Sequence, residues 1–321
     1  MKLSALFVGV ALLGACEKTG GGAGASVSSD EKAFLQYLPS GETALVGGNY
    51  LKFQDWMNTS PLGKLVGKLS QVSPGLTEWT TCFGQFKSVK MLSGVKVAGG
   101  MFEMRMLMSG ISIGDIEGCA NKAKFGPTVD ADKKYIGITM PNPVGGTIQT
   151  GYFVLPNNSL YMRQSMAFTG GGAMTTVDRK ALEADIAGLS AGTAEKDTAL
   201  LDLMKTVDRT KPIWFVGNAA GTPAEAKIGA VRGWIDITNG LAIDASVEMK
   251  DKAMADQIIQ GVPQMKQQAG AMGGAVGDIV KSLAVVKEGD AIRFKVTITN
   301  DQLQKVMDQV GPMMGGAFGA H

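Results

Sequence analysis

The sequence predicts an α+β fold made of two diverged copies of one unit, each an antiparallel sheet packed with helices. Alternating apolar patterns that border Gly99-Gly100 and Asn239-Gly240 indicate β-hairpins, and hairpins build antiparallel sheets. Apolar residues at helical spacing follow each hairpin. The order strand, hairpin, helix, strand occurs twice along the chain, and this order, more than residue identity, indicates the repeat.

The chain begins with a secretory signal. Met1 and Lys2 form a basic start, and residues 3–13 form an apolar run too short to span a bilayer, which takes about 20 residues. Residues 13–16 read Leu-Gly-Ala-Cys and fit a lipobox, the site at which bacterial lipoproteins are cleaved and acylated. We therefore expect residues 1–15 to be removed and Cys16 to carry lipid. The alternative is an ordinary secreted protein in which Cys16 follows small residues by chance.

A tether follows the lipidation site. Residues 16–31 are rich in Gly and Ser and have no apolar pattern, which is typical of a flexible linker. Two or three acyl chains, such as palmitate, anchor a protein stably, whereas a single chain holds it only marginally. We expect a globular body bound to the envelope membrane through its lipid and facing the periplasm or the cell surface.

The first half, residues 32–208, contains most of the predicted elements. A short helix over 33–38 precedes Pro39, and Asp178 lies near the start of the last helix of this half. Strands are predicted over 43–46, 86–98, 102–108, 135–140, 152–155 and 160–166, and helical spacing is found over 50–57, 62–69, 113–124 and 177–189.

The second half, residues 209–311, repeats this order on a smaller scale. A strand over 213–216 resembles the strand at Leu45, and residues 231–249 form a hairpin with a type I′ turn signal at Asn239-Gly240. A helix over 251–265 follows. The strand over 292–299 then matches the strand at Tyr135, and a closing helix covers 301–310. Residues 312–321 form a Gly/Met-rich tail.

Composition bounds the partners. The chain has 31 basic and 29 acidic side chains, and loss of Lys2 with the signal leaves nearly balanced charge without a polybasic run. Nothing therefore favours nucleic acid as a partner. A hydrophobic content of 45% is typical of a globular chain that can build a core.

The cysteines indicate an oxidising compartment. With Cys16 lipidated, Cys82 and Cys119 remain as an even pair, which we interpret as a disulfide; two buried free thiols are the alternative. A loop of this length would contribute about 4 kcal/mol in the chain-entropy model. The spacing is not that of a redox CxxC motif, and no His nearby suggests a metal site.

The strongest catalytic pattern is Gly110-Ile111-Ser112-Ile113-Gly114, which fits a nucleophile elbow between a strand and a helix. The single His, His321, is the last residue and is poorly placed to act as the base of a triad. Ser112 and Asp115 also have capping-box spacing, so we favour a helix cap over a hydrolase.

Other patterns lack the partners that their chemistry needs. Ser29 to Lys32 fits S-x-x-K without the further motifs of β-lactamases, and Asp130-Ala131-Asp132 lacks the rest of a calcium loop. Met104, Met106 and Met108 could suggest copper, but their alternation favours core packing. The glycines at 270, 273, 274 and 277 indicate a helix break or a close crossing against the sheet. We expect no cofactor and no metal.

Residues 38–39 (Leu-Pro) before a strand, the paired Cys82 and Cys119, and the run Lys-Pro-Ile-Trp-Phe-Val at 211–216 resemble a family of uncharacterised Gram-negative lipoproteins. The resemblance implies an envelope location and offers no catalytic residues. Glu17, where inner-membrane lipoproteins have Asp, favours the outer membrane.

The sequence therefore predicts a membrane-anchored, non-enzymatic module that binds or scaffolds an envelope protein. A carrier or chaperone for an apolar ligand such as a lipid is the alternative, in which the Met-rich strand would line a cavity. A serine hydrolase ranks third.

Overall fold

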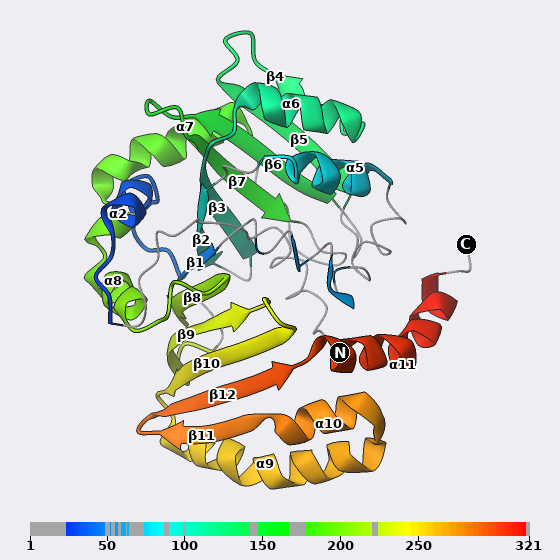
Figure 1. Cartoon of the computed structure of the whole chain (residues 1–321). Helices are drawn as coiled ribbons and strands as arrows, with labels where there is room; N and C mark the ends of the chain where they lie inside the picture. Colours follow the sequence, from blue (N-terminus) through cyan, green and yellow to red (C-terminus); the bar gives the residue numbers. More distant parts are fainter. Residues whose placement is uncertain are drawn as a thin grey trace.

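The computed structural model describes residues 24–48, 52, 55–56, 59–61, 63, 74–86, 90–98, 101–141, 147–166, 177–219 and 224–318. Their strands form one 12-stranded sheet of order β11-β12-β10-β9-β8-β1-β2-β3-β7-β6-β5-β4, in which each neighbouring pair is antiparallel (Figure 1). The predicted α+β class, with a hairpin-built antiparallel sheet packed with helices, is confirmed.

The strands are as follows: β1 Ala44–Gly48, β2 Lys90–Ala98, β3 Met101–Ser109, β4 Thr128–Val129, β5 Tyr135–Pro141, β6 Thr147–Val154, β7 Leu160–Met166, β8 Ile213–Asn218, β9 Ile228–Asp236, β10 Leu241–Met249, β11 Ala284–Glu288 and β12 Ala291–Ile298. The helices are α2 Ser29–Leu35, α5 Pro74–Phe83, α6 Ile113–Lys122, α7 Arg179–Gly188, α8 Thr198–Lys205, α9 Lys252–Met272, α10 Gly274–Ser282 and α11 Asn300–Phe318, with 3₁₀ turns at Leu189–Ala191 and Ala194–Lys196.

Constant spacing identifies two copies of one unit. Ser28 caps α2 and Asp197 caps α8, and in both cases the next strand, β1 or β8, begins 16 residues after the cap. Each of these strands starts a three-stranded meander, β1-β2-β3 or β8-β9-β10, which a helix follows. We therefore divide the chain into a first copy, residues 24–192, and a second copy, residues 193–318.

Each meander is extended by the second strand of a later hairpin. β7 lies beside β3, and β12 lies beside β10, so β12 corresponds to β7. The expected match between the strand near Ile292 and the strand near Tyr135 is therefore wrong. The strand at Tyr135 is β5, which belongs to an additional part of the first copy at the far edge of the sheet.

The two copies meet where β1 pairs with β8, a seam of five residue pairs from Ala44↔Gly217 to Gly48↔Ile213. The backbones can approach here because glycines leave room for their neighbours. A Cβ on Gly47 would lie 2.3 Å from the Trp214 ring, and one on Gly217 would lie 2.7 Å from the Ala44 Cβ. The large Trp214 side chain thus fills the space that Gly47 leaves empty.

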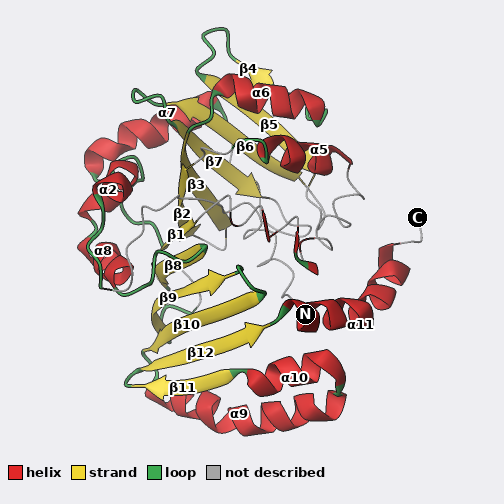
Figure 2. Cartoon of the chain, viewed as in Figure 1, coloured by secondary structure: helices red, strands yellow, loops and turns green. Residues whose placement is uncertain are grey.

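The sheet has two faces, which we name by their side chains in the first copy. The methionine face carries Met104, Met106 and Met108, which pack against α5 and α6. The arginine face carries Arg105 and Arg163. Figure 2 shows α5 and α6 on one side of the first copy and α2 and α7 on the other, the side on which α8 of the second copy also lies.

The second copy is covered differently. α9 packs on its methionine face, where Ala255 contacts Met249 and Ile292, and α10 packs against α9. α8 covers β8 on the arginine face, with Leu200 and Met204 in one core cluster with Val216. α11, which occupies the place of α7 in the element order, extends away from the sheet beside α10 (Figure 1). On the arginine face of β9, Trp234 borders the core cluster that includes Leu200 and Met204 of α8, whereas no helix of the described chain shares a core cluster with the arginine-face residues of β10 and β12.

Several boundaries differ from the expected ones. Residues 24–31, which the sequence placed in the tether, belong to the fold, because Val27 is buried and Ser28 caps α2. At the other end, α11 continues to Phe318 through most of the predicted tail. The turn after β9 is not type I′, since Gly240 has φ +114° while Asn239 lies outside the positive-φ region that this turn requires. The helices expected over 50–57 and 62–69 lie largely outside the described residues.

Candidate functional site: chain entry and the arginine face

The described chain enters the fold beside α8. The Gly24 backbone N–H donates to the Lys205 carbonyl at 2.6 Å, and the side chain of Val27 is buried. Cys16 lies outside the described residues, eight positions before Gly24. Because a residue spans at most about 3.6 Å, a lipid on Cys16 would hold this entry point within roughly 29 Å of the membrane surface.

Arg209 fixes this entry segment. Its guanidinium is fully buried, with Nε 2.8 Å from Glu31 Oε1 and Nη2 2.9 Å from the Ser26 carbonyl. The same group donates to the carbonyl of Met204 at the end of α8. Glu31 also accepts from the Ser28 N–H at 2.7 Å, which completes a capping box on α2. One ion pair therefore joins the start of the first copy to the second copy.

A larger charged cluster lies on the arginine face of the first copy, beneath α7. The side chains of Arg105 and Arg163 both reach Asp185 of α7, at 3.3 and 3.2 Å. Both also reach Glu103, at 3.0 and 3.2 Å. Arg105 Nη1 lies 3.3 Å from Glu42, and the Tyr161 hydroxyl donates to Asp185 at 2.9 Å. Asp185 is the group through which the helix contacts the charges of the sheet.

Burial and charge set the protonation of this cluster. Burial alone would lower the pKa of Arg105, but Tyr161, Glu42 and Asp185 together raise it above its ordinary value. Burial raises the pKa of Tyr161 well above its usual range, and the carboxylate of Asp185 adds to the shift. The guanidinium therefore stays charged and the phenol stays protonated, which is the form that donates to Asp185.

The second copy carries a smaller charged cluster at the corresponding place. Arg105 lies seven residues before Ser112, the N-cap of α6, and Asp244 lies seven residues before Asp251, the N-cap of α9. On the neighbouring strand, Arg163 is opposite Arg105 and Lys295 is opposite Asp244. The central residue is thus an Arg in one copy and an Asp in the other.

Asp244 is held by two cations. Arg293 contacts its carboxylate through Nε at 2.7 Å and Nη2 at 2.8 Å, and Lys295 lies 3.3 Å away. Burial opposes ionisation, but the hydrogen bonds and charges of Arg293 and Lys295 outweigh it, so the pKa of Asp244 lies below its usual value. Unlike the cluster of the first copy, this one reaches the surface, with 33% of Arg293 and 50% of Lys295 exposed.

Around Asp244, the uncovered arginine face forms a candidate binding surface, which we call the open face. Its side chains are partly or fully exposed except for Asp244: Arg232, Trp234, Ser246, Glu248, Arg293, Lys295 and Thr297. Near its border with β8, the Lys211 ammonium lies 4.6 Å from the Trp234 ring centroid and 3.1 Å from Asp236. Mixed charges beside an aromatic ring suit contact with a protein surface of similar polarity.

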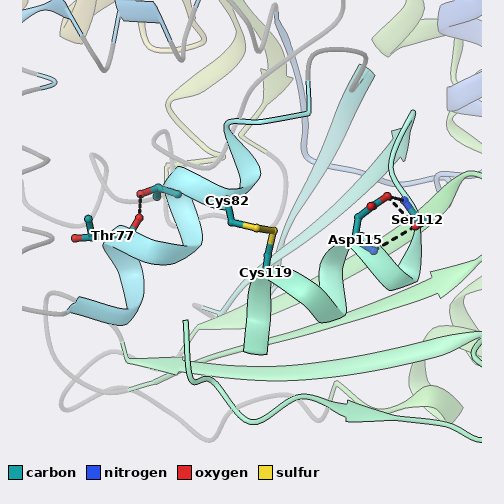
Figure 3. Close-up of a disulfide and its surroundings, with 6 residues drawn as sticks. Thr77, Cys82, Ser112, Asp115 and Cys119 are labelled. Carbon is teal, nitrogen blue, oxygen red and sulfur yellow. Dashed lines mark hydrogen bonds between the residues drawn. A yellow bond between two sulfur atoms is a disulfide. The ribbon is translucent and has the colours of Figure 1, made fainter. Parts of the chain in front are cut away.

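Ser112 is a helix cap. Its Oγ accepts from the Asp115 N–H at 3.2 Å, while the Asp115 carboxylate accepts from the Ser112 N–H at 2.9 Å and from its hydroxyl at 2.7 Å (Figure 3). The hydroxyl hydrogen is therefore already bound to a carboxylate on the same helix. His321 lies outside the described residues.

The predicted disulfide joins Cys82 of α5 to Cys119 of α6, with the Cα atoms 5.5 Å apart (Figure 3). Both cysteines are buried in the core on the methionine face, among Trp79 and the three methionines of β3. The bond therefore holds together the two helices that cover the methionine face of the first copy.

The remaining sequence patterns have structural roles. Met104, Met106 and Met108 lie in the core with exposures of 1% or less. The guanidinium of Arg179 lies 2.9 Å from both Asp130 and Asp132, where a calcium ion would have to bind. Within the described ranges, no group of three or more His, Cys, Asp or Glu side chains could hold a metal ion.

The glycine run at 270–277 separates and packs two helices. Gly273, with φ +63°, ends α9, and a Cβ on Gly277 of α10 would lie 2.6 Å from the Ala269 carbonyl. The expected break is present, but the close crossing is against α9 and not, as the sequence suggested, against the sheet. None of the helices in the described part of the chain combines the length and apolarity needed to cross a membrane.

The sequence did not single out the charged residues of the arginine face. The alternation of β3 placed Glu103 and Arg105 opposite the methionines, so a charged strand face was visible. What the alternation could not give was the partner residues, because Glu42 and Asp185 lie 63 and 80 positions from Arg105.

Comparison with known proteins gives distant structural matches. No family model matches the chain, and no curated protein matches it. Among solved structures, crystal form I of TP0453 is similar with a TM-score of 0.41 and 9% identity, over 86% of this chain and 97% of that one. Crystal form III gives a TM-score of 0.41, 10% identity and coverage of 86% and 98%. Crystal form IV gives 0.38, 12%, 85% and 96%.

Proposed function

We propose that this protein is a lipid-anchored module of the bacterial cell envelope that binds or scaffolds another envelope protein and has no catalytic role. The open face carries the proposal. In the first copy α7 covers the corresponding surface and contributes Asp185 to its charges, whereas the second copy leaves the surface around Asp244 without a helix in the described chain. Arg293 and Lys295 on this sheet face form ion pairs and are also exposed to solvent. A partner could therefore contact them without displacing a helix of the described chain.

The anchor supports this function through the N-terminal sequence and the position of the chain entry. A lipid on Cys16 would lie eight residues before Gly24, and the described fold would then begin close to the membrane. The entry point adjoins the open face, since Arg232 of β9 donates to Thr206, the residue after the Lys205 that receives the Gly24 N–H. We propose that the open face binds its partner near the membrane. Glu17, the residue after Cys16, favours the outer membrane as the location.

The two alternative functions lose their specific support. In a hydrolase the Ser112 hydroxyl would donate to a base that a third group orients, whereas here it donates to Asp115, its partner in the helix cap. The alternative of a lipid carrier rests on a cavity lined by the Met-rich strand. Met104, Met106 and Met108 instead pack against the two helices that the disulfide joins.

Fractionation of cells that make the Cys16→Ser chain tests the anchor. The wild type should incorporate labelled palmitate and stay with the membranes after a carbonate wash, whereas the variant should take up no label and become soluble. Retention of the variant in the washed membranes would contradict lipid anchoring.

Photo-crosslinking in intact cells tests the binding surface. A photoreactive phenylalanine analogue at Ser246, in the middle of the open face, should give an adduct of defined mass with another protein. The matched control carries the analogue at Glu183, an exposed residue of α7 on the covered side of the first copy. Equal labelling from both positions, or none from Ser246, would contradict a partner site on the open face.

A further inference from the structure

One edge of the sheet is available for pairing. At one end lies β4, a strand of two residues, and at the other lies β11 with five. Four of the five residues of β11 are exposed, and Val286 in its centre is 45% exposed. Only one other large apolar side chain in the described chain, Met265, is exposed to a similar degree. An edge strand with an exposed apolar residue at its centre can pair with another strand.

The hairpin determines which backbone groups point outward. Glu288 is opposite Ala291, so Gly289 and Asp290 form a two-residue turn, and φ +64° at Gly289 fits type II′. In such a hairpin the pairs nearest the turn alternate between hydrogen-bonded and non-hydrogen-bonded. The backbone groups of Val285 and Lys287 therefore point away from β12. Across the described chain, no backbone hydrogen bond outside the hairpin involves residues of β11.

These outward groups are symmetric about Val286. We infer that β11 pairs antiparallel with β11 of another molecule of this protein, on a two-fold axis through Val286. Val285 of one chain would then exchange two hydrogen bonds with Lys287 of the other, and the same pair would form on the far side of the axis. Self-complementary contacts of this kind are the usual form of a two-fold interface.

The side chains suit this pairing. The two Val286 side chains would meet at the centre, in a non-hydrogen-bonded pair whose side chains lie close together. Ala284 would oppose Glu288, and Val285 would oppose Lys287, so no like charges stand directly opposite each other. Val285 and Lys287 are already positioned by α9, since Val285 packs in its core cluster and Lys287 pairs with Asp256. The strand is thus held ready for a partner.

A short strand gives a small interface, which is most easily detected as a covalent crosslink. In the proposed dimer the two Cα atoms at position 286 would be about 4.5 Å apart, within disulfide range. The full chain with Val286→Cys, oxidised gently in whichever cell fraction contains it, should form a disulfide-linked dimer at least tenfold more than the wild type. The control Met265→Cys places a thiol at the other exposed apolar site, on α9, and should not.

A proline separates edge pairing from chance collision. Lys287→Pro removes an outward N–H, leaves the hairpin bonds in place and should abolish crosslinking of Val286→Cys, whereas Lys287→Ala retains the N–H and should preserve it. Circular dichroism confirms that each variant folds. Three results would each overturn pairing between two molecules of this protein. They are equal crosslinking of the Val286→Cys and Met265→Cys variants, crosslinking that survives Lys287→Pro, and an adduct with a different protein.

Discussion

The two copies share one sheet but treat the same face in opposite ways. In the first copy, the charged side chains and Tyr161 on the arginine face lie beneath α7, and Asp185 of that helix contacts both Arg105 and Arg163. In the second copy, Asp244 and its two cations lie at the corresponding place without a covering helix in the described chain. The difference lies in the last helix of each copy, because α7 returns over the sheet and α11 leaves it. Strand pattern decides where a charge points, and the connection after the last strand decides whether it is buried.

The largest expected effect concerns the helices of the first copy. Removing the disulfide with Cys82→Ala and Cys119→Ala should lower the free energy of unfolding by about 4 kcal/mol, because it frees a loop closed over a separation of 37 residues. Urea unfolding measures the loss. Hydrogen exchange should accelerate in α5 and α6 more than in α9, which has no such bond. Two thiols that react with maleimide in denatured, unreduced wild-type protein would contradict the bridge.

Matched substitutions of the two clusters compare burial directly. Asp185→Asn should cost about 3 kcal/mol, because it removes charge from a carboxylate that two buried guanidinium groups share. Asp244→Asn should cost about 1 kcal/mol or less, because its cations are exposed to water and to salt. Urea unfolding of both variants in low and high salt checks this. Equal costs would mean that the cover supplied by α7 does not matter.

The seam determines whether the two copies unfold together. Gly47→Ala should destabilise the protein by about 2 kcal/mol, because its methyl group would overlap the Trp214 ring. Gly118→Ala in α6 is the control: no atom lies within 4 Å of its Cβ position, and a helical Gly→Ala change should stabilise by about 0.5–1 kcal/mol. Calorimetry should show whether the weakened seam separates the transition into two. Destabilisation by both variants would remove the argument from close approach.

The smallest effect should be the same in both copies. Ser112→Ala and Asp251→Ala remove corresponding helix caps, and each should cost about 1 kcal/mol. Ser112→Asp should be nearly neutral, because Asp caps a helix about as well as Ser. Thermal unfolding measures these changes. A fluorophosphonate probe provides a second check on Ser112, since covalent labelling that depends on His321 would identify a nucleophile instead of a cap.

Local patterns predicted the parts of this fold that local residues determine. Alternation gave β2 and β3, and the spacing of Ser112 and Asp115 gave a cap with its partner. The short helix α8 was missed, because its burial depends on Val216 and Trp214 of the following strand. β11 and α10 were also missed, because the apolar run at 283–286 is only four residues long and the glycines at 273, 274 and 277 lower the helix propensity of this segment.

The candidate site was less predictable than the fold. An exposed charge on a strand and a charge buried beneath a helix have the same alternation, so Arg105 and Asp244 cannot be told apart by pattern. The correspondence between the charged clusters around Arg105 and Asp244 became visible only through the register of β3 with β7 and of β10 with β12.

The contacts of Arg209 with Glu31 and Ser26 have a mechanical consequence. The first residues of the first copy are held by the second copy, through the carbonyl of Lys205 and the guanidinium that binds Ser26 and Glu31. A pulling force on the N-terminus therefore acts on both copies at once. The force does not have to pass through the five residue pairs between β1 and β8 to reach the second copy. A force applied at the N-terminus would have to break the contacts of Arg209 before it could separate the strands of the sheet.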